Sequence, residues 1–246
     1  MVNNINAFFS GKSCIAANLL KLYQVGLRLV TISRPKKLNL VLRRLKTAGQ
    51  KNCCKGRGDF RMFNINLGTI GGANLREANL KGANLEKANL KEANFKWCNL
   101  REAKCHGADL SDTNLIETDF ERADVIQANF QRANLKGADL EEANLKWANL
   151  GKVNLRETNL ERVDFTGANL KKSNLKGSNM KEANLEGTNL RWANLRDTHN
   201  LSFDQISEVL TLQGIKLNEE LFKSLKEDYY SLFIGPENSM NDEILP

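Results

Sequence analysis

The chain has 246 residues, a formal net charge of +7 and a sequence pI of about 9.1. Its two histidines, His106 and His199, lie far apart along the chain, and its five cysteines include no two pairs at zinc spacing. We therefore expect no catalytic residue, no metal site and no cofactor. An odd number of cysteines without a signal peptide predicts a reducing compartment, and hence a cytoplasmic protein.

The charge is divided unevenly among three segments, which predicts three different roles. Residues 1–58 hold 12 Lys or Arg and no acidic residue, residues 59–200 hold 21 basic and 20 acidic residues, and residues 201–246 hold three basic and nine acidic residues. The basic start and the acidic finish could meet head to tail between molecules, so a monomer and a head-to-tail oligomer are both open.

The first segment, residues 1–58, is expected to be basic and helical. Residues 13–32 are mostly apolar but include Lys21 and Arg28, which argues against a transmembrane helix. Four roles are open for the segment. It could cap the repeats that follow, lie on an anionic membrane surface, bind nucleic acid or an acidic partner as an arm, or be cleaved as a segment that targets an organelle.

Residues 59–200 repeat with a period of five residues, as in GGANLREANLKGANLEKANLKEANF from residue 71 to residue 95. Five residues carry a side chain about 140° further round an α-helix, so no apolar helix face forms. In a flat strand an odd spacing sends successive leucines to opposite sides. The chain must therefore bend once per repeat and wind around one axis, which predicts a solenoid with the leucines inside.

The repeat is almost unbroken. From Leu75 to Leu195 every fifth residue is apolar, and we call these the central residues. The residue before each is Asn or Asp, with Lys104 as the exception, and the residue before that is Ala, Ser, Thr, Cys or Val. Only small side chains fit beside leucine in so narrow a core, and Asn or Asp can bond the nearby backbone at a bend. Phe120 and Phe130 are expected on opposite walls of one coil.

The tandem motif A-(N/D)-L-x-x resembles the pentapeptide repeat family over more than half of the chain. The resemblance implies a right-handed, four-sided β-helix of about seven coils, with one pentapeptide per side. It also implies that the central residue and the small residue two places before it point inward, while the other three residues face out. Some members of this family act as duplex-DNA mimics that bind topoisomerases.

The last segment predicts a helical cap over residues 201–234 and a disordered tail over residues 235–246. Ser202 and Gln205 have capping-box spacing ahead of a helix that begins at Phe203, and Asn218 can cap a second helix. Cyanobacterial members of the family often end in a similar short helical tail, so the resemblance also implies a cyanobacterial source.

The four-sided coil brings every twentieth residue together and so predicts the charge of each wall. Two adjoining walls are net basic, and the wall through Leu80, Leu100 and Phe120 is net acidic. Nearby carboxylates such as Glu157 would neutralise part of the basic walls. Exposed tryptophan commonly anchors protein contacts. The candidate interaction surface comprises Lys136, Lys152, Arg156, Lys171, Lys172, Lys176, Arg191, Trp192 and Arg196.

Two kinds of function follow from this surface. The first is a non-enzymatic structural or interaction module, a rigid rod that presents charged surfaces to a protein partner. The alternative is a nucleic-acid-related role, either direct binding through the basic arm and the basic walls or topoisomerase binding by DNA mimicry. The net charge disfavours mimicry, because a mimic of phosphates must be acidic. Residues 1–58 could add a peripheral membrane contact, which is the alternative to a purely cytoplasmic location.

Overall fold

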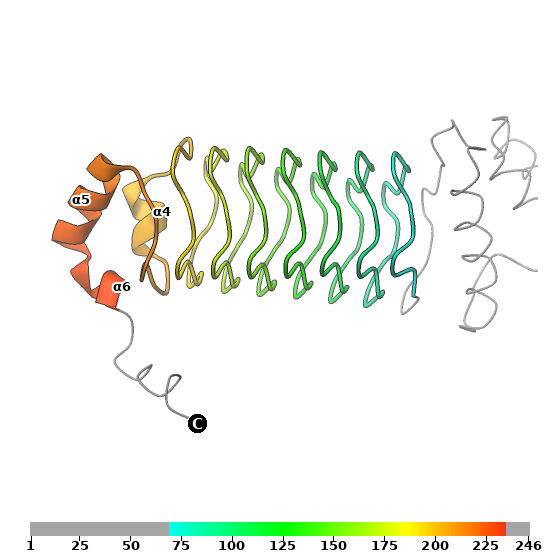
Figure 1. Ribbon diagram of the computed structural model, residues 1–246, viewed down its shortest axis with the longest axis horizontal. Helices are drawn as coiled ribbons and strands as arrows, with labels where there is room; N and C mark the ends of the chain where they lie inside the picture. The colour runs from blue at the N-terminus through cyan, green and yellow to red at the C-terminus, as the bar shows by residue number, and fades with distance from the viewer. Residues whose placement is uncertain (1–68, 235–246) are drawn as a thin grey trace, which may run out of the picture.

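The computed structural model describes residues 69–234, so the expectations for residues 1–58, for a repeat start at 59 and for the tail 235–246 lie outside the described residues. The described chain winds in stacked coils along one axis and ends in three short helices (Figure 1). Parallel bridges join residues 20 apart, from Thr69 with Asn89 through to Asn179 with His199. Four pentapeptides therefore make one coil.

Each pentapeptide contains one tight bend just after its central residue. The carbonyl of Leu75, for example, accepts a hydrogen bond of 3.0 Å from the N–H of Ala78. From Glu77 to Asp197, every residue two places after a central residue has a φ between 52° and 71°. This left-handed conformation at the third residue of a turn is what a type II turn requires. The bend predicted once every five residues is thus present along the coils.

The asparagines and aspartates stabilise these bends as the sequence predicts. Asn134 Oδ1 accepts a hydrogen bond of 3.2 Å from the N–H of Lys136, and the same contact recurs through the coils. The amide groups also bond one another between coils, since Asn154 Nδ2 donates to Asn134 Oδ1 at 2.9 Å. Each asparagine or aspartate before a central residue therefore holds its own turn, and where two asparagines stack, one can also bond the other.

The central residues fill the interior of the coils. Phe120, Val125, Phe130 and Cys105 are all fully buried. The rings of Phe120 and Phe130 meet edge to face, with centroids 6.1 Å apart, which confirms that they lie within one coil. Buried threonine hydroxyls are paired in several coils, since Thr118, Thr158 and Thr188 each donate to a main-chain carbonyl. The core therefore combines close packing with polar groups that are mostly satisfied, the buried Ser173 hydroxyl being an exception.

The first C-terminal helix, α4 (Phe203–Ser207), takes the place of one wall in the last coil. Ser202 and Gln205 form the predicted capping box at its start. The Gln205 side-chain amide also donates hydrogen bonds of 2.7 Å to the carbonyls of Met180 and Ala183. These carbonyls lie in the coil below, so one side chain supplies donors where the regular backbone ladder is interrupted.

After α4 the chain returns to the solenoid, and this return was not predicted. The helix expected to continue from Phe203 ends at Ser207, because the residues that follow pair with the coil below. Thr211 bridges Asn189 and Lys216 bridges Asn194, so this last coil is longer than a regular one by the two extra positions that α4 takes up. Backbone pairing with a preformed coil edge therefore overrides the local helical pattern in this segment.

The last two helices, α5 (Glu219–Asp228) and α6 (Tyr230–Ile234), cover the end of the coils. Leu225 is buried, and the carbonyl of Leu232 accepts a hydrogen bond of 2.7 Å from the N–H of Leu212. Asn218 precedes α5 but makes no side-chain cap, because its Oδ1 accepts from the N–H of Asp197 at 3.1 Å. Within residues 69–234, no helix combines the length and the apolar character that a membrane span needs.

Two exposed tryptophans lie over glycines of the following coil. A Cβ atom added to Gly167 would sit 2.6 Å from Trp147 Cδ1, and one added to Gly214 would sit 1.9 Å from Trp192 Cδ1. Both glycines also have a positive φ, of 64° and 66° respectively. These two turns therefore require glycine for its small size as well as for its backbone conformation.

We expect Phe120→Ala to lower the free energy of unfolding by about 3 to 5 kcal/mol, because it removes a fully buried ring and leaves a cavity. Urea or thermal unfolding of the full chain measures the change. Phe203→Ala is the matched control, since Phe203 in α4 is 42% exposed and should cost far less. If both variants lowered the free energy of unfolding equally, the burial of Phe120 in the core would be contradicted.

We expect Gly167→Ala to destabilise the chain more than Gly177→Ala does. Both substitutions place a side chain at positive φ, at about 1 to 2 kcal/mol each. Only Gly167 meets Trp147, however, while an added Cβ at Gly177 would lie 3.7 Å from its nearest neighbour. The additional cost should be about 1 to 3 kcal/mol. In a Trp147→Ala background the difference between the two alanine variants should vanish, and its persistence would contradict the stacking.

Candidate interaction surface

The candidate residues lie around a flat strip along one side of the rod, which we call the basic face. In each pentapeptide of this side the chain runs as in residues 152–156, where Val153 and Leu155 are buried and the three residues between and beside them face outward. Asn154 therefore forms the floor of the strip, and Lys152 and Arg156 form its two edges. Because the parallel bridges set equivalent residues of successive coils side by side, each edge becomes a row of side chains.

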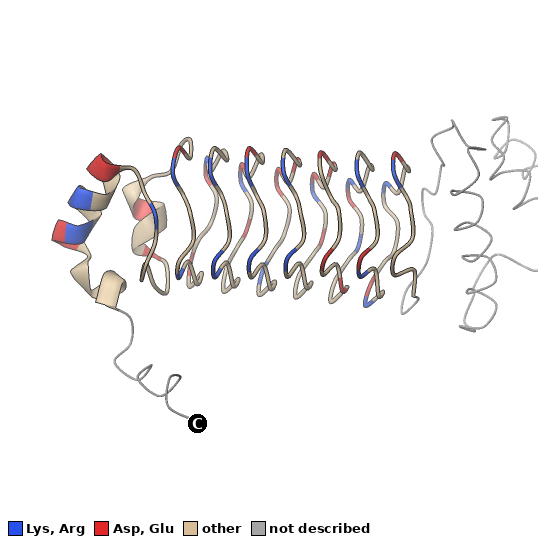
Figure 2. Cartoon of the chain, in the orientation of Figure 1, with Lys and Arg blue, Asp and Glu red and all other residues tan. Residues whose placement is uncertain are grey.

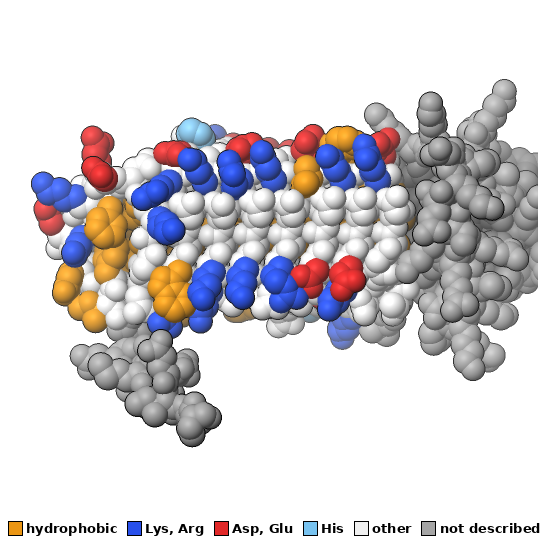
Figure 3. Space-filling model, viewed as in Figure 1, with side chains coloured by type: hydrophobic (Ala, Val, Ile, Leu, Met, Phe, Trp, Pro, Cys, Tyr) orange, Lys and Arg blue, Asp and Glu red, His pale blue; other side chains and the backbone are white. Residues whose placement is uncertain are grey.

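The two rows differ along their length. The first row consists of Arg76, Lys96, Ile116, Lys136, Arg156, Lys176 and Arg196, and the second of Glu92, Asp112, Arg132, Lys152, Lys172 and Trp192. Figure 3 shows such rows on either side of an uncharged strip, both of them basic toward the helical end of the rod. Figure 2 shows how charged residues of one sign follow each other from coil to coil. The second row is basic at Arg132, Lys152 and Lys172, and in the last coil Arg191, next to Trp192, supplies its cation. The basic face is thus two-sided only in its last four coils.

The floor of the basic face is an unbroken ladder of asparagines. Asn134, Asn154, Asn174 and Asn194 follow one another through parallel bridges. Asn194 Nδ2 donates to Asn174 Oδ1 at 3.2 Å, and each of these Oδ1 atoms also accepts a main-chain N–H. The floor is therefore polar and uncharged, and its side-chain amides bond in two pairs, Asn154 with Asn134 and Asn194 with Asn174.

Carboxylates neutralise part of the basic face, as the sequence predicted. Glu157 lies 3.3 Å from Lys136 Nζ and 3.5 Å from Arg156, and Asp197 lies 3.2 Å from Lys176 Nζ. These are exposed pairs, which contribute little to stability. Among residues 69–234, no carboxylate forms a salt bridge with the remaining candidate cations, which are Lys152, Lys171, Lys172, Arg191 and Arg196.

Four of the candidate residues come together at Trp192. Arg191 lies over the indole at 4.2 Å from the ring centroid, Lys172 at 4.8 Å and Lys171 at 5.3 Å. The indole remains 39% exposed. Cation–π contacts of this kind hold flexible basic side chains near one surface while leaving their charge available. The sequence placed Trp192 on this wall but did not reveal the cluster.

On the acidic wall, by contrast, most carboxylates form ion pairs with basic side chains of the same wall. Arg122 Nε lies 2.7 Å from Glu142, and Lys181 Nζ lies 2.9 Å from Glu161. The hydrogen bond from Arg122 lowers the pKa of the Glu142 carboxyl, and the one from Lys181 lowers the pKa of Glu161. Arg162 links both glutamates across neighbouring coils. The basic face therefore has more unpaired charge, relative to the acidic wall, than the numbers of charged residues on the two indicate.

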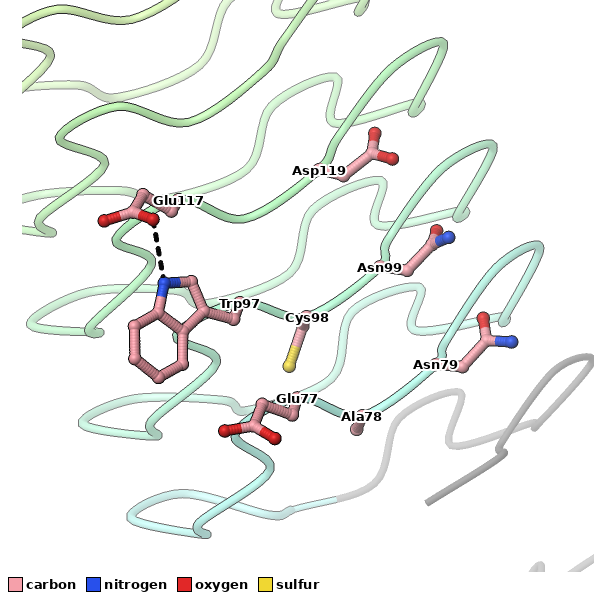
Figure 4. A pocket seen from close by; sticks show the side chains of 8 residues that line it. All are labelled: Glu77, Ala78, Asn79, Trp97, Cys98, Asn99, Glu117 and Asp119. Atoms are coloured by element: carbon pink, nitrogen blue, oxygen red, sulfur yellow. Dashed lines mark hydrogen bonds between the residues drawn. The ribbon is translucent and has the colours of Figure 1, made fainter. Parts of the chain in front are cut away.

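A hollow of about 470 Å³ lies at the other end of the rod, near the first described coils (Figure 4). The Trp97 indole N–H donates to Glu117 Oε2 at 2.9 Å, while Arg76 and Lys96 lie over its ring at 4.1 and 4.2 Å. Burial raises the pKa of Asp119, whose neighbour Arg101 lies 3.8 Å away. The hollow is lined by Glu77, Ala78, Asn79, Trp97, Cys98, Asn99, Glu117 and Asp119.

The cysteine beneath this hollow is a core residue. Cys98 Sγ donates to the carbonyl of Leu75 at 2.7 Å, and burial raises the pKa of its thiol to about 12. Burial raises the pKa of Cys105 to about 12 as well. A thiol with such a pKa is not an available nucleophile near neutral pH. Residues 69–234 also contain no group of three His, Cys, Asp or Glu side chains placed to hold a metal ion.

Known structures share this fold. Two trypsin-treated variants of QnrB1, a plasmid-mediated fluoroquinolone resistance protein, are 25% and 24% identical to the chain, with TM-scores of 0.55 and 0.52. Each alignment covers 70% of this chain and 91% of the other. HetL, a pentapeptide repeat protein involved in heterocyst differentiation regulation from the cyanobacterium Nostoc sp. strain PCC 7120, is 26% identical over 72% of this chain and 89% of its own, with a TM-score of 0.35.

No curated protein matches the chain in sequence. The family model for pentapeptide repeats, however, matches it in eight copies, over residues 71–104, 103–141, 118–157 and 158–197. The matched residues together span more than half of the chain and coincide with the regular coils. The chain therefore belongs to the pentapeptide repeat family.

Proposed function

We propose that this chain is a non-enzymatic interaction module whose basic face contacts a protein partner. One observation carries the proposal. Five cations of the basic face lack a carboxylate partner among the described residues, whereas most glutamates of the adjoining acidic wall are paired. A rigid rod that leaves one sign of charge free on one side is suited to recognise a partner of opposite charge.

The finer features of the module belong to the same proposal. We take the coil to be right-handed, as is implied by the family, with α4, α5 and α6 as its C-terminal cap. We also take the protein to act in the cytoplasm. Membership of the family supports an interaction role, since its repeats build surfaces without a catalytic centre. The fluoroquinolone resistance named for QnrB1 describes that protein, and we do not extend it to this one.

Nucleic acid is the second candidate, because unpaired cations attract phosphates as well as carboxylates. Duplex-DNA mimicry is disfavoured, because a mimic of phosphates must be acidic, whereas residues 59–200 hold 21 basic and 20 acidic residues. A filter-binding assay between roughly 50 and 200 mM salt separates the two candidates. A steep loss of retention with salt would favour nucleic acid, and no retention even at low salt would remove it.

We predict that reversing four unpaired cations, Lys152→Glu, Lys172→Glu, Arg191→Glu and Arg196→Glu, abolishes specific capture of a protein partner by the full chain. Each reversal replaces attraction with like-charge repulsion, which lowers both the rate of encounter and the affinity. Affinity capture from a nuclease-treated lysate measures the effect, and the nuclease removes contacts that nucleic acid would bridge.

The matched control reverses four other basic residues, Lys87, Lys104, Lys223 and Lys226, and so changes the net charge equally. Among residues 69–234, none of these four forms a salt bridge. Capture by this variant should equal that of the unmodified chain, and the thermal midpoints of both variants should be compared first. Identical capture by both variants would sink the proposal.

A further inference from the structure

We propose that the basic face receives one acidic α-helix of a partner protein, laid lengthwise along the last four coils with its two acidic edges against the two basic rows. This inference rests on the proposed function and adds to it the chemistry and the shape of the partner. It draws on the repeat distance of the rows, the distance between them, their limited length and the place of Trp192.

The repeat distance of the rows favours a helix over a strand. Successive side chains in a row belong to neighbouring coils, which stack at the usual inter-strand distance of about 4.8 Å. A helix offers one residue per turn on each edge, with a pitch of ~5.4 Å. A strand offers one on each face every ~6.8 Å, twice its rise per residue. Over three coil intervals the helix falls out of step by about 2 Å and the strand by about 6 Å, and only the smaller mismatch is within easy reach of flexible lysines.

The distance between the rows also suits a helix. Lys152 and Arg156 flank the strip on one pentapeptide and are four residues apart, so their Cα atoms are separated by at most about 14 Å. A helix with its side chains is about 10 to 12 Å wide. Between the rows, the asparagine floor is uncharged, and each of its Oδ1 atoms already accepts a main-chain N–H, so a bound helix would bury no charge there.

The rows are basic on both sides only over a short length. Toward the other end of the rod the second row turns acidic at Asp112 and Glu92, and Asp112 is held by Arg132 at 2.6 Å. The hydrogen bond from Arg132 lowers the pKa of the Asp112 carboxyl, so that position stays negative at neutral pH. From Arg132 to Arg191 the two-sided part spans three coil intervals, or about 14 Å, which matches some 10 helical residues. A long phosphate backbone would run onto these carboxylates, whereas a short acidic helix would not.

Trp192 lies at the end of the second row, next to the helical end of the rod. Its indole is packed over Gly214 and surrounded by Lys171, Lys172 and Arg191, yet it stays partly exposed. An apolar side chain at one end of the bound helix could rest on it, as aromatic residues commonly anchor contacts. A contact with Trp192 would thus fix which end of the bound helix lies at the helical end of the rod, whereas the charges alone allow both orientations.

The test uses the full chain with Trp97→Phe and Trp147→Phe, so that Trp192 alone reports on binding. The probe is an alanine-based peptide of about 14 residues with glutamates on two adjacent edges of its helix, a length that is barely helical by itself. We expect a saturable change in Trp192 fluorescence and an increase in helical circular dichroism on mixing. A peptide of the same composition in scrambled order should bind at least about tenfold more weakly, because its charges no longer match the rows.

Variants place the site on the basic face. The double variant Lys152→Glu with Lys172→Glu should bind the peptide at least about tenfold more weakly than the parent chain does. The control pair Lys87→Glu with Lys104→Glu should bind it within about twofold of the parent affinity. Equal weakening by both pairs, or no preference between the ordered and the scrambled peptide, would overturn the proposal. So would tighter binding of a thymidine oligonucleotide of equal charge. If the peptide does not bind while the full chain still captures a protein partner, the proposed interaction function is kept and the proposal of an acidic helix is rejected.

Discussion

One constraint underlies the whole structure: the backbone must bend at a positive φ once in every five residues. That bend turns an extended chain into a side of a coil, so each fifth residue points inward and every twentieth residue lies above the last. Non-glycine residues are strained there, and the ladder of backbone hydrogen bonds between coils holds them in place. Core, turn and surface are consequences of this one repeat.

The same repeat determines how charge behaves on the surface. Side chains of equivalent residues stack about 4.8 Å apart, so like charges in a row repel unless a partner lies between them. The acidic wall resolves this with arginines such as Arg122 and Arg162, which bridge glutamates of neighbouring coils. In the last coils of the basic face, Lys152 and Lys172 have no such partner among the described residues. This unrelieved repulsion is tolerable at an exposed surface and would be relieved by an anionic partner.

Much of the fold could be predicted from the sequence, because the period of five admits only one kind of backbone. The inward central residues, the turn-forming asparagines and the contact of Phe120 with Phe130 all follow from spacing. The return of residues 211–217 to the coil could not be predicted, since it depends on pairing with a preformed edge. The Trp192 cluster was missed for a similar reason, because Gly214 lies two positions beyond the place that the regular repeat predicts. The stack of Trp147 on Gly167 keeps the regular spacing, which could have revealed it.

The cation cluster at Trp192 lies where the regular coil ends. In regular coils each residue lies beside the equivalent residue of the next coil. Side chains of one kind therefore form rows that run along the rod. The last coil departs from this rule, because Gly214 follows Trp192 by 22 residues in place of 20, although the indole packs over it much as Trp147 packs over Gly167. Three cations then gather on that indole, at the end of rows that are already basic. A cluster of cations around one indole thus lies where the repeat stops, while the uniform coils before it extend the two rows and the asparagine floor.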